Sequence, residues 1–183
     1  TRSNAGAYVC NVRVEDSCFV GGTNVGGIVG KLQNAGISNC VSAALIANGE
    51  YTGGIAGNTV WADISRSISY GRIIAKRTGY CGGVVGYLDS SKTINCANFA
   101  TVYSRSRNPY VGGISGFSYH NDIIYNCYNV GTIAMEDGYY GAILGCANEY
   151  KKNEGATFDQ CYYLNGSAGT HGACGATIGK TAI

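Results

Sequence analysis

The sequence predicts an all-β parallel solenoid (β-helix) with about 29 residues per turn, three short strands in each turn and five to six turns. Two observations predict it: a glycine phrase returns five times at a nearly fixed interval, and a cysteine position recurs at the same interval. No segment keeps a helical period of apolar residues over about ten residues or more. We expect a single domain over residues 1–183, with an atypical first turn at about 1–24, regular turns at about 25–145, and a last turn with a C-terminal cap at about 146–183.

The glycine phrase has the form Gly-Gly-aliphatic-x-Gly. Its copies are Gly26–Gly30, Gly53–Gly57, Gly82–Gly86, Gly112–Gly116 and the weaker Gly141–Gly145, and their closing glycines lie 27, 29, 30 and 29 residues apart. Paired glycines before an aliphatic residue indicate a tight corner, where the backbone takes a positive φ or lies too close to the next turn for a side chain. In the last copy Ala142 replaces the second glycine, which suggests that this position tolerates a methyl group.

The second recurring position is a cysteine in all copies but one. Its members are Cys10, Cys40, Ser67, Cys96, Cys127 and Cys161. We expect an interior column of free thiols, because a free cysteine packs as a small hydrophobic residue. The preceding residue is polar in most copies, and asparagines there can hydrogen-bond along the stack.

Three short apolar runs in each copy complete the predicted turn. In the first full copy they surround Ile28, Cys40 and Ile46, and they are rich in β-branched residues and bounded by Gly, Asn and Ser, as strands are. Inward side chains of parallel strands would then form columns spaced about 4.8 Å apart.

Composition supports an ordered chain and argues against several functions. Glycine accounts for 29 of 183 residues, but 45% of residues are hydrophobic and 15 are tyrosine, which opposes disorder. The net charge of +2, without a basic stripe, argues against nucleic-acid binding. No apolar run suggests membrane insertion and no signal peptide is present. The chain starts at Thr1 without Met, so we interpret it as part of a longer chain.

The nine cysteines do not have the spacing of a zinc site. Parallel in-register side chains point the same way, which makes disulfides within the column awkward. One alternative remains, in which Cys174 pairs with Cys161 or Cys146.

These phrases resemble the GLUG repeat. The resemblance rests on Val25 to Gly30 followed by Ile37 to Cys40, and on Val111 to Gly116 followed by Ile124 to Cys127. It covers about residues 8–166, with Ser67 and Ala142 as departures. GLUG repeats occur in large secreted or cell-wall-attached bacterial proteins, including adhesin-like ones. The resemblance therefore implies an extracellular module at the bacterial cell surface, and the family has no catalytic residues to carry over.

A further column is a candidate ligand-binding surface. Two residues before the first glycine of the phrase stand Tyr51, Tyr80, Tyr110 and Tyr139. A file of tyrosines on a flat face can stack on sugar rings and offer hydroxyl groups. Alternatively, the rings stack on one another and cover a corner of the core. From this column we predict a rigid stalk with an adhesive surface for a host glycan or cell-surface protein; a spacer without a ligand is the simpler alternative.

The carboxylates decide whether a catalytic hypothesis is tenable. Parallel β-helices include polysaccharide lyases and hydrolases, whose sites need clustered carboxylates. Asp63, Asp89 and Asp122 follow successive glycine phrases at offsets of 6, 3 and 6 residues, so they form no regular column. His120 and His171 lie in different contexts. We therefore expect a protein that is not an enzyme and has no cofactor or metal, with a carbohydrate-active β-helix as the alternative.

The ends of the array depart from the pattern. The first turn has Glu15 and Asp16 where later turns have an aliphatic residue, and a charged insertion lies between Ile143 and Phe158. An open solenoid end exposes strand edges. We expect the insertion to be a flanking loop with a capping role, or alternatively part of a cap formed with residues 165–183.

Overall fold

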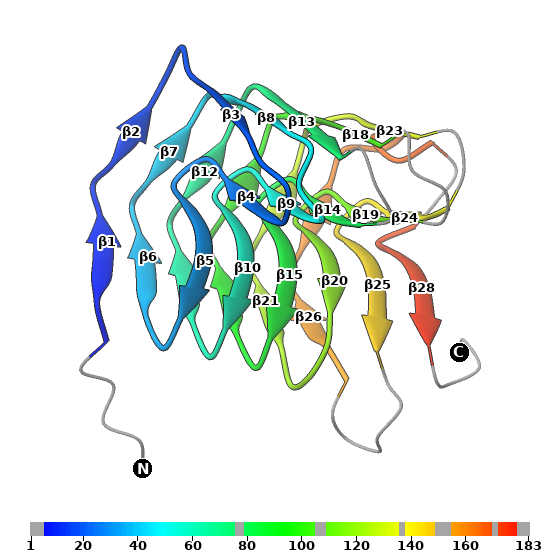
Figure 1. Cartoon of the computed structure of the whole chain (residues 1–183). Helices are drawn as coiled ribbons and strands as arrows, with labels where there is room; N and C mark the ends of the chain where they lie inside the picture. The colour runs from blue at the N-terminus through cyan, green and yellow to red at the C-terminus, as the bar shows by residue number, and fades with distance from the viewer. Residues whose placement is uncertain are drawn as a thin grey trace.

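The structure is a computed structural model that describes residues 6–75, 79–104, 109–135, 138–148, 155–169 and 172–178. Within these residues the chain forms 28 short strands and no helix. The strands follow one another turn after turn along one axis, with β1 at one end of the stack and β28 at the other (Figure 1). The predicted all-β parallel solenoid is confirmed, because every strand pairs in parallel with its counterpart in the neighbouring turn. The charged insertion, at Glu149 to Glu154, and His171 lie outside the described residues.

Five parallel sheets, A to E, run along the stack, and the chain visits them in the same order in each turn. Sheet A contains β1 (Tyr8–Cys10), β6 (Gly36–Ser38), β11 (Asp63–Ser65), β16 (Lys92–Ile94), β21 (Ile123–Tyr125) and β26 (Thr157–Asp159). Sheet B contains β2 (Arg13–Val14), β7 (Val41–Ser42), β12 (Ile68–Ser69), β17 (Ala97–Asn98), β22 (Tyr128–Asn129) and β27 (Tyr162–Tyr163). Sheet C contains β3 (Cys18–Val20), β8 (Leu45–Ala47), β13 (Arg72–Ala75), β18 (Thr101–Ser104) and β23 (Ile133–Met135).

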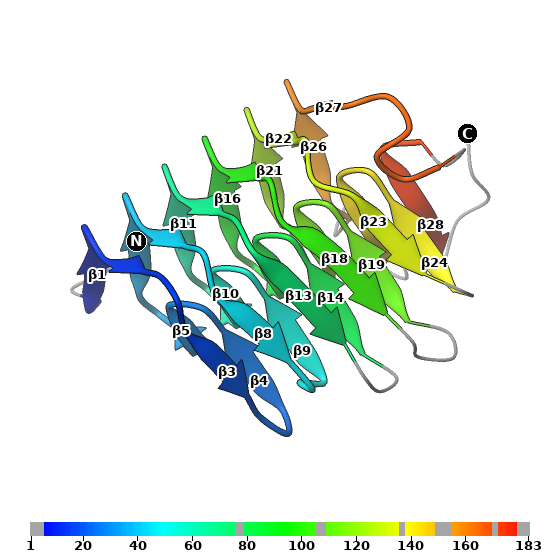
Figure 2. The same ribbon diagram turned by 90° about the horizontal axis from the view of Figure 1, so that it is seen from above.

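The other two sheets lie on either side of the glycine corner. Sheet D contains β4 (Asn24–Gly26), β9 (Tyr51–Gly53), β14 (Tyr80–Gly82), β19 (Tyr110–Gly112) and β24 (Tyr139–Gly141). Sheet E contains β5 (Val29–Gln33), β10 (Ala56–Val60), β15 (Val85–Asp89), β20 (Ser115–Ser118), β25 (Leu144–Asn148) and β28 (Cys174–Ile178). Sheets C and D advance together along the stack when it is viewed from above (Figure 2). Five complete turns are followed by a sixth that has strands only in sheets A, B and E among the described residues.

Each complete turn has five strands, which corrects the expected three. The run around Ile28 folds at the paired glycines into a strand of sheet D and a strand of sheet E. The run around Cys40 folds at Asn39, which has a φ of 55°, into a strand of sheet A and a strand of sheet B. A corner leaves the apolar pattern unbroken, so one run in the sequence becomes two strands.

The cysteine column is shifted in the first turn. Cys10 is the Cα partner of Ser38 and is exposed, so it does not belong to the column. Val12 lies opposite Cys40, because its two neighbours in the chain are paired with those of Cys40: Asn11 bonds to Asn39, and Arg13 is the Cα partner of Val41. Later members keep the predicted register, and Cys40, Cys96 and Cys127 are buried. In the same way Phe19, and not the acidic pair, stands opposite Ile46.

The polar residue before each column member lies at a left-handed corner. Asn11, Asn39, Arg66, Asn95, Asn126 and Gln160 all have φ between 48° and 59°. Asparagine tolerates this conformation better than most residues, because its short polar side chain bonds locally. Asn39 donates to Asn11 at 2.7 Å and Asn126 donates to Asn95 at 2.7 Å, which confirms the predicted amide bonds along the stack.

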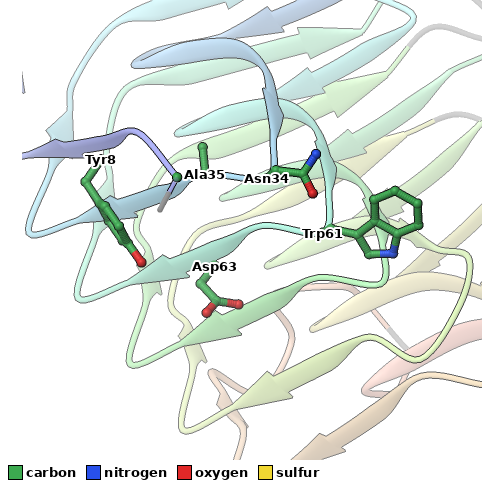
Figure 3. A pocket seen from close by; sticks show the side chains of 6 residues that line it. Tyr8, Asn34, Ala35, Trp61 and Asp63 are labelled. Carbon is green, nitrogen blue, oxygen red and sulfur yellow. The ribbon is translucent and has the colours of Figure 1, made fainter. Parts of the chain in front are cut away.

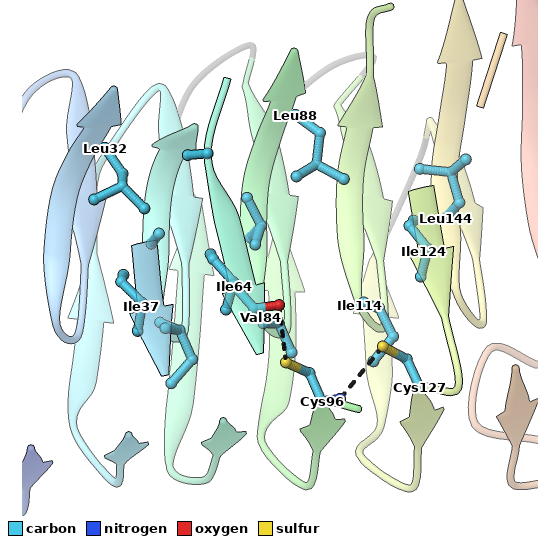
Figure 4. Close-up of a cluster of buried hydrophobic side chains, with 14 of the residues drawn as sticks. Leu32, Ile37, Ile64, Val84, Leu88, Cys96, Ile114, Ile124, Cys127 and Leu144 are labelled. Atoms are coloured by element: carbon cyan, nitrogen blue, oxygen red, sulfur yellow. Dashed lines mark hydrogen bonds between the residues drawn. The ribbon is translucent and has the colours of Figure 1, made fainter. Parts of the chain in front are cut away.

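The interior contains two hydrophobic cores. One lies between sheets A and E and includes Ile37, Leu88 and Cys96, and equivalent side chains such as Ile37 and Ile64 line up from turn to turn (Figure 4). The other lies between sheets C and D and includes Ile46 and Cys81.

A waist of polar residues separates the two cores where the glycine corner meets the end of sheet B. Its buried polar members are Ser42, Ser69, Asn98 and Asn129. Asn98 Nδ2 donates to Asn129 Oδ1 at 2.8 Å, and Asn98 Oδ1 accepts from the Ala100 amide at 3.0 Å. This inner amide ladder was not predicted.

The paired glycines are required by close approach and not by positive φ. A Cβ on Gly53 would lie 2.0 Å from the Ala56 carbonyl oxygen, and a Cβ on Gly83 would lie 2.1 Å from the Gly113 oxygen and 2.2 Å from the Asn98 side chain. In the inner turns, the buried side chain that a methyl group would meet comes from the next turn, as Asn129 does for Gly113. Ala142 occurs in the last complete turn, and the residue that follows Asn129 in this column is Tyr163, which is 43% exposed. The methyl group is therefore tolerated at the end of the stack and not in the inner turns, which corrects the expectation for the second glycine.

Candidate functional sites

The four candidate tyrosines form a continuous ladder on sheet D. Their Cα atoms are in register, and neighbouring rings stack at centroid distances of 5.3, 5.4 and 5.4 Å with interplanar angles of 9° to 12°. Tyr80 and Tyr110 thus have a neighbouring ring on each face. A sugar ring cannot stack on these two faces, and what remains for a ligand is the row of ring edges and hydroxyl groups.

A second aromatic row from sheet E packs against the ladder. Tyr87 meets Tyr80 edge-on at 5.4 Å, and Phe117 lies 4.8 Å from Tyr80 and 5.3 Å from Tyr110. Burial raises the pKa of Tyr80 and of Tyr87 above the ordinary value of a phenol. The ladder therefore covers the outside of the glycine corner, as in the alternative stated above, while Tyr139 at its end stays 47% exposed.

Asp89 lies close enough to Asp122 for its charge to contribute to raising the pKa of that buried carboxyl, whereas Asp63 lies on another sheet. Asp63 lies in a strand of sheet A, and Asp89 accepts a hydrogen bond from His120 Nδ1 at 3.2 Å. Asp122 is buried and accepts from the Ser91 amide, the Ser118 hydroxyl and the Tyr119 amide at 2.8, 2.5 and 3.0 Å. Its burial raises its pKa to about 7, against the effect of these bonds. A carboxyl group enclosed in this way cannot reach a substrate.

The buried cysteines are not accessible as nucleophiles, whereas Cys10 and Cys18 are exposed. None of the nine forms a disulfide, so the alternative pairing of Cys174 with Cys161 or Cys146 is not formed. Burial raises the pKa of the Cys81 thiol to about 12, which keeps it protonated. Among the described residues, no group of three or more His, Cys, Asp and Glu side chains could hold a metal ion. No helix in the described part of the chain has the length and apolar character needed to cross a membrane.

An exposed aromatic strip on sheet B and its corner with sheet C was missed in the sequence. It consists of Tyr70, Phe99, Tyr128, Val130, Tyr162 and Leu164, which are 38% to 67% exposed. Tyr70 stacks on Phe99 at 5.1 Å, and Phe99 meets Tyr128 edge-on at 5.9 Å. At its C-terminal end the strip borders a shallow hollow of about 310 Å³ between Tyr128, Tyr162 and Leu164. The recurrence could have been seen in the sequence, because an aromatic or aliphatic residue follows the cysteine position by three residues in these turns. Without the strand register, however, the sequence did not show that these side chains point outward.

The comparisons with known proteins support the fold. No family model matches the chain, and no curated protein matches it, so the GLUG resemblance rests on the sequence phrases. A solved structure described as "a putative immunoglobulin A1 protease from Bacteroides ovatus" is similar over 85% of this chain, with a TM-score of 0.62 and 23% identity. The chain spans about half of that protein, 49% of its length. The molecule is thus a parallel β-solenoid repeat protein.

This neighbour corrects one expectation. The prediction that the chain is not an enzyme was wrong to exclude catalysis, because the similar structure carries the name of a protease. At 23% identity the likeness shows the fold alone, and it transfers neither an activity nor a catalytic residue to this chain.

Proposed function

We propose that the chain is a rigid repeat module of an extracellular bacterial surface protein, and that its aromatic strip adheres to a host glycan. The observation that carries the proposal is the strip itself: six large apolar side chains, four of them aromatic, remain exposed on one side of a well-packed solenoid. Isolated exposed apolar residues need no explanation, but a contiguous group indicates an interaction surface.

The strip offers flat aromatic rings to a sugar. Tyr128, Tyr162 and Tyr163 line the hollow, whose exposed wall is apolar, and each of these rings also carries a hydroxyl group. A pyranose has the matching character, with an apolar face of C–H groups and a rim of hydroxyls. The stacked turns hold these rings at fixed spacing, so little conformational entropy is lost on binding. The GLUG resemblance supports the extracellular setting and a place in a longer chain.

The tyrosine ladder enters the proposal as a second, weaker contact. Its ring edges and hydroxyls can hydrogen-bond to a glycan that runs along the stack. Tyr139 is the most exposed member, so its replacement by Ala tests this contact with the least effect on packing.

A glycan array with the purified chain tests the proposal, together with mucin before and after enzymatic removal of its glycans. We expect a reproducible sugar class to bind, and Tyr162→Ala with Tyr128→Ala to weaken that binding at least about tenfold, since a lost aromatic contact contributes about 1 kcal/mol or more. Tyr125→Ala, an exposed tyrosine of sheet A, is the matched control and should leave it unchanged. Equal binding to deglycosylated mucin would instead point to a protein ligand and reject the glycan.

A further inference from the structure

The outer face of sheet A carries a groove near β1 that is separate from the strip, and its exposed wall is more apolar than polar. It has a volume of about 450 Å³, and its wall includes Tyr8, Ser38, Asp63, Ser65 and Arg66. One aromatic ring, one carboxylate, one guanidinium and two hydroxyl groups are thus gathered from three neighbouring turns. The two described side chains of opposite charge, Asp63 and Arg66, form no ion pair with each other, so their hydrogen-bonding capacity remains for a ligand.

The guanidinium lies at the groove because it interrupts the outer amide ladder. Asn39 bonds to Asn11 and Asn126 bonds to Asn95, but Arg66 occupies the place between these two pairs. Its φ of 48° is one that asparagine adopts more readily than arginine. Arg66 donates one hydrogen bond, to Ser38 Oγ at 3.1 Å, and a guanidinium has five N–H donors. The pattern of the repeat therefore does not account for an arginine at this position.

The aromatic ring lies on a glycine. A Cβ on Gly36, the Cα partner of Tyr8, would lie 2.4 Å from Tyr8 Cε1 and 2.6 Å from Cδ1, so this edge of the ring lies directly against Gly36. Tyr8 is nevertheless 66% exposed. Figure 3 shows its ring extending toward the strand that carries Asp63, with Trp61 at the neighbouring corner. The ring thus meets Gly36 along its Cδ1–Cε1 edge, and most of the side chain is presented to solvent.

From this arrangement we infer that the groove binds one neutral pyranose unit of a glycan, with the sugar's C–H face on Tyr8 and its vicinal hydroxyls on Asp63 and Arg66. A carboxylate accepts from two hydroxyl groups while a guanidinium donates to their oxygens, so a neutral polyol uses both charges. The ligand class rests on the proposed glycan-binding role, but the site and its residues are independent of the strip.

Trp61 provides the measurement, because it is the single tryptophan of the chain. It lines a small pocket of about 10 Å³ that adjoins the groove and shares Tyr8 and Asp63 with it. The full chain is titrated with the methyl glycosides of glucose, galactose and mannose, followed by Trp61 fluorescence and by calorimetry in parallel. We expect saturable binding of at least one glycoside in the millimolar range. Arg66→Asn should weaken it at least about tenfold, since hydrogen bonds to charged groups are lost, while continuing the amide ladder and keeping the fold.

Two further variants separate the ring from the fold. Gly36→Ala displaces only the Tyr8 side chain, so it should also weaken binding about tenfold without unfolding the chain. Tyr8→Phe keeps the ring and should bind as the unchanged chain does. Arg72→Ala, at an exposed arginine of sheet C outside the groove and the strip, is the control and should leave glycoside binding unaltered.

Saturation by none of the three glycosides in either measurement overturns the inference, as does unchanged binding by Arg66→Asn and Gly36→Ala. Binding that survives those two variants but is lost in Tyr162→Ala would reject the groove and leave the strip as the glycan site. Loss of array binding in the strip variants, with glycoside titration intact, would instead show two separate sites.

Discussion

Replacing Asp122 should remove much of the dependence of stability on pH. Asp122 is buried, with three hydrogen bonds, and its pKa is raised from 3.8 to about 7. Because the folded-state pKa lies above the unfolded one, folding favours the protonated form. The contribution of Asp122 to the free energy of unfolding is most favourable below about pH 4, and it is lost as the pH rises from there through 7. The rise of this pKa from 3.8 to about 7 corresponds to a change of about 4 kcal/mol in the free energy of unfolding.

Asp122→Ser is the matched variant, because Ser91 holds the same position in the preceding turn and bonds to the Ala62 amide at 3.1 Å. Urea unfolding followed by circular dichroism at pH 4, 6 and 8 gives the free energy of unfolding of both proteins. The unchanged chain should be the more stable one at pH 4, and its advantage should shrink by about 4 kcal/mol by pH 8. A constant difference across this range would show that the carboxyl titrates normally and that its burial is wrongly described.

Three further predictions concern the columns, and thermal or urea unfolding checks each. Ser42→Ala should be neutral or stabilising by up to about 1 kcal/mol, because its buried hydroxyl has no partner among the described residues, whereas Asn98→Ala should cost about 2 kcal/mol or more by leaving the Ala100 amide unpaired. Gly83→Ala should prevent stable folding, whereas Ala142→Gly should cost about 1 kcal/mol or less; equal effects would contradict the end-of-stack explanation. Cys96→Asp should cost about 3 kcal/mol or more, and Cys10→Asp almost nothing; destabilisation by both would restore Cys10 to the column.

Much of the fold could be predicted because each recurring residue type has a local reason to recur. Aliphatic residues and cysteines repeat where side chains point inward, and Ile46, Ile73, Val102 and Ile133 are in register as the spacing predicted. The outer asparagines repeat because a left-handed corner favours them. The register failed in the first turn, where seven residues separate Val12 from Phe19 and six separate Cys40 from Ile46. In the later turns, the glycine phrase of the preceding turn gives a fixed point from which positions can be counted. The first turn has no such phrase before it, so the sequence did not reveal its added residue.

The candidate surfaces were less accessible to the sequence. The tyrosine column was located correctly, but whether its rings face a ligand or one another depends on the ring orientations along sheet D and on the sheet E rings that pack against them. The strip and the groove depend on which side of a two- or three-residue strand faces outward. Alternation over so few residues does not determine that direction until the corners on either side are placed.

The sequence alone therefore determined the repeat length, the parallel stacking and the residue types of the columns, because these follow from a unit that pairs with its own copies. The tertiary structure alone decided that there are five strands per turn, two cores separated by a polar waist, and stacked tyrosines on the outside of the glycine corner. The physical reason is that corners are made by close backbone approach and by left-handed residues. Both bend the chain without interrupting its apolar pattern, so their effect appears only when neighbouring turns are in contact.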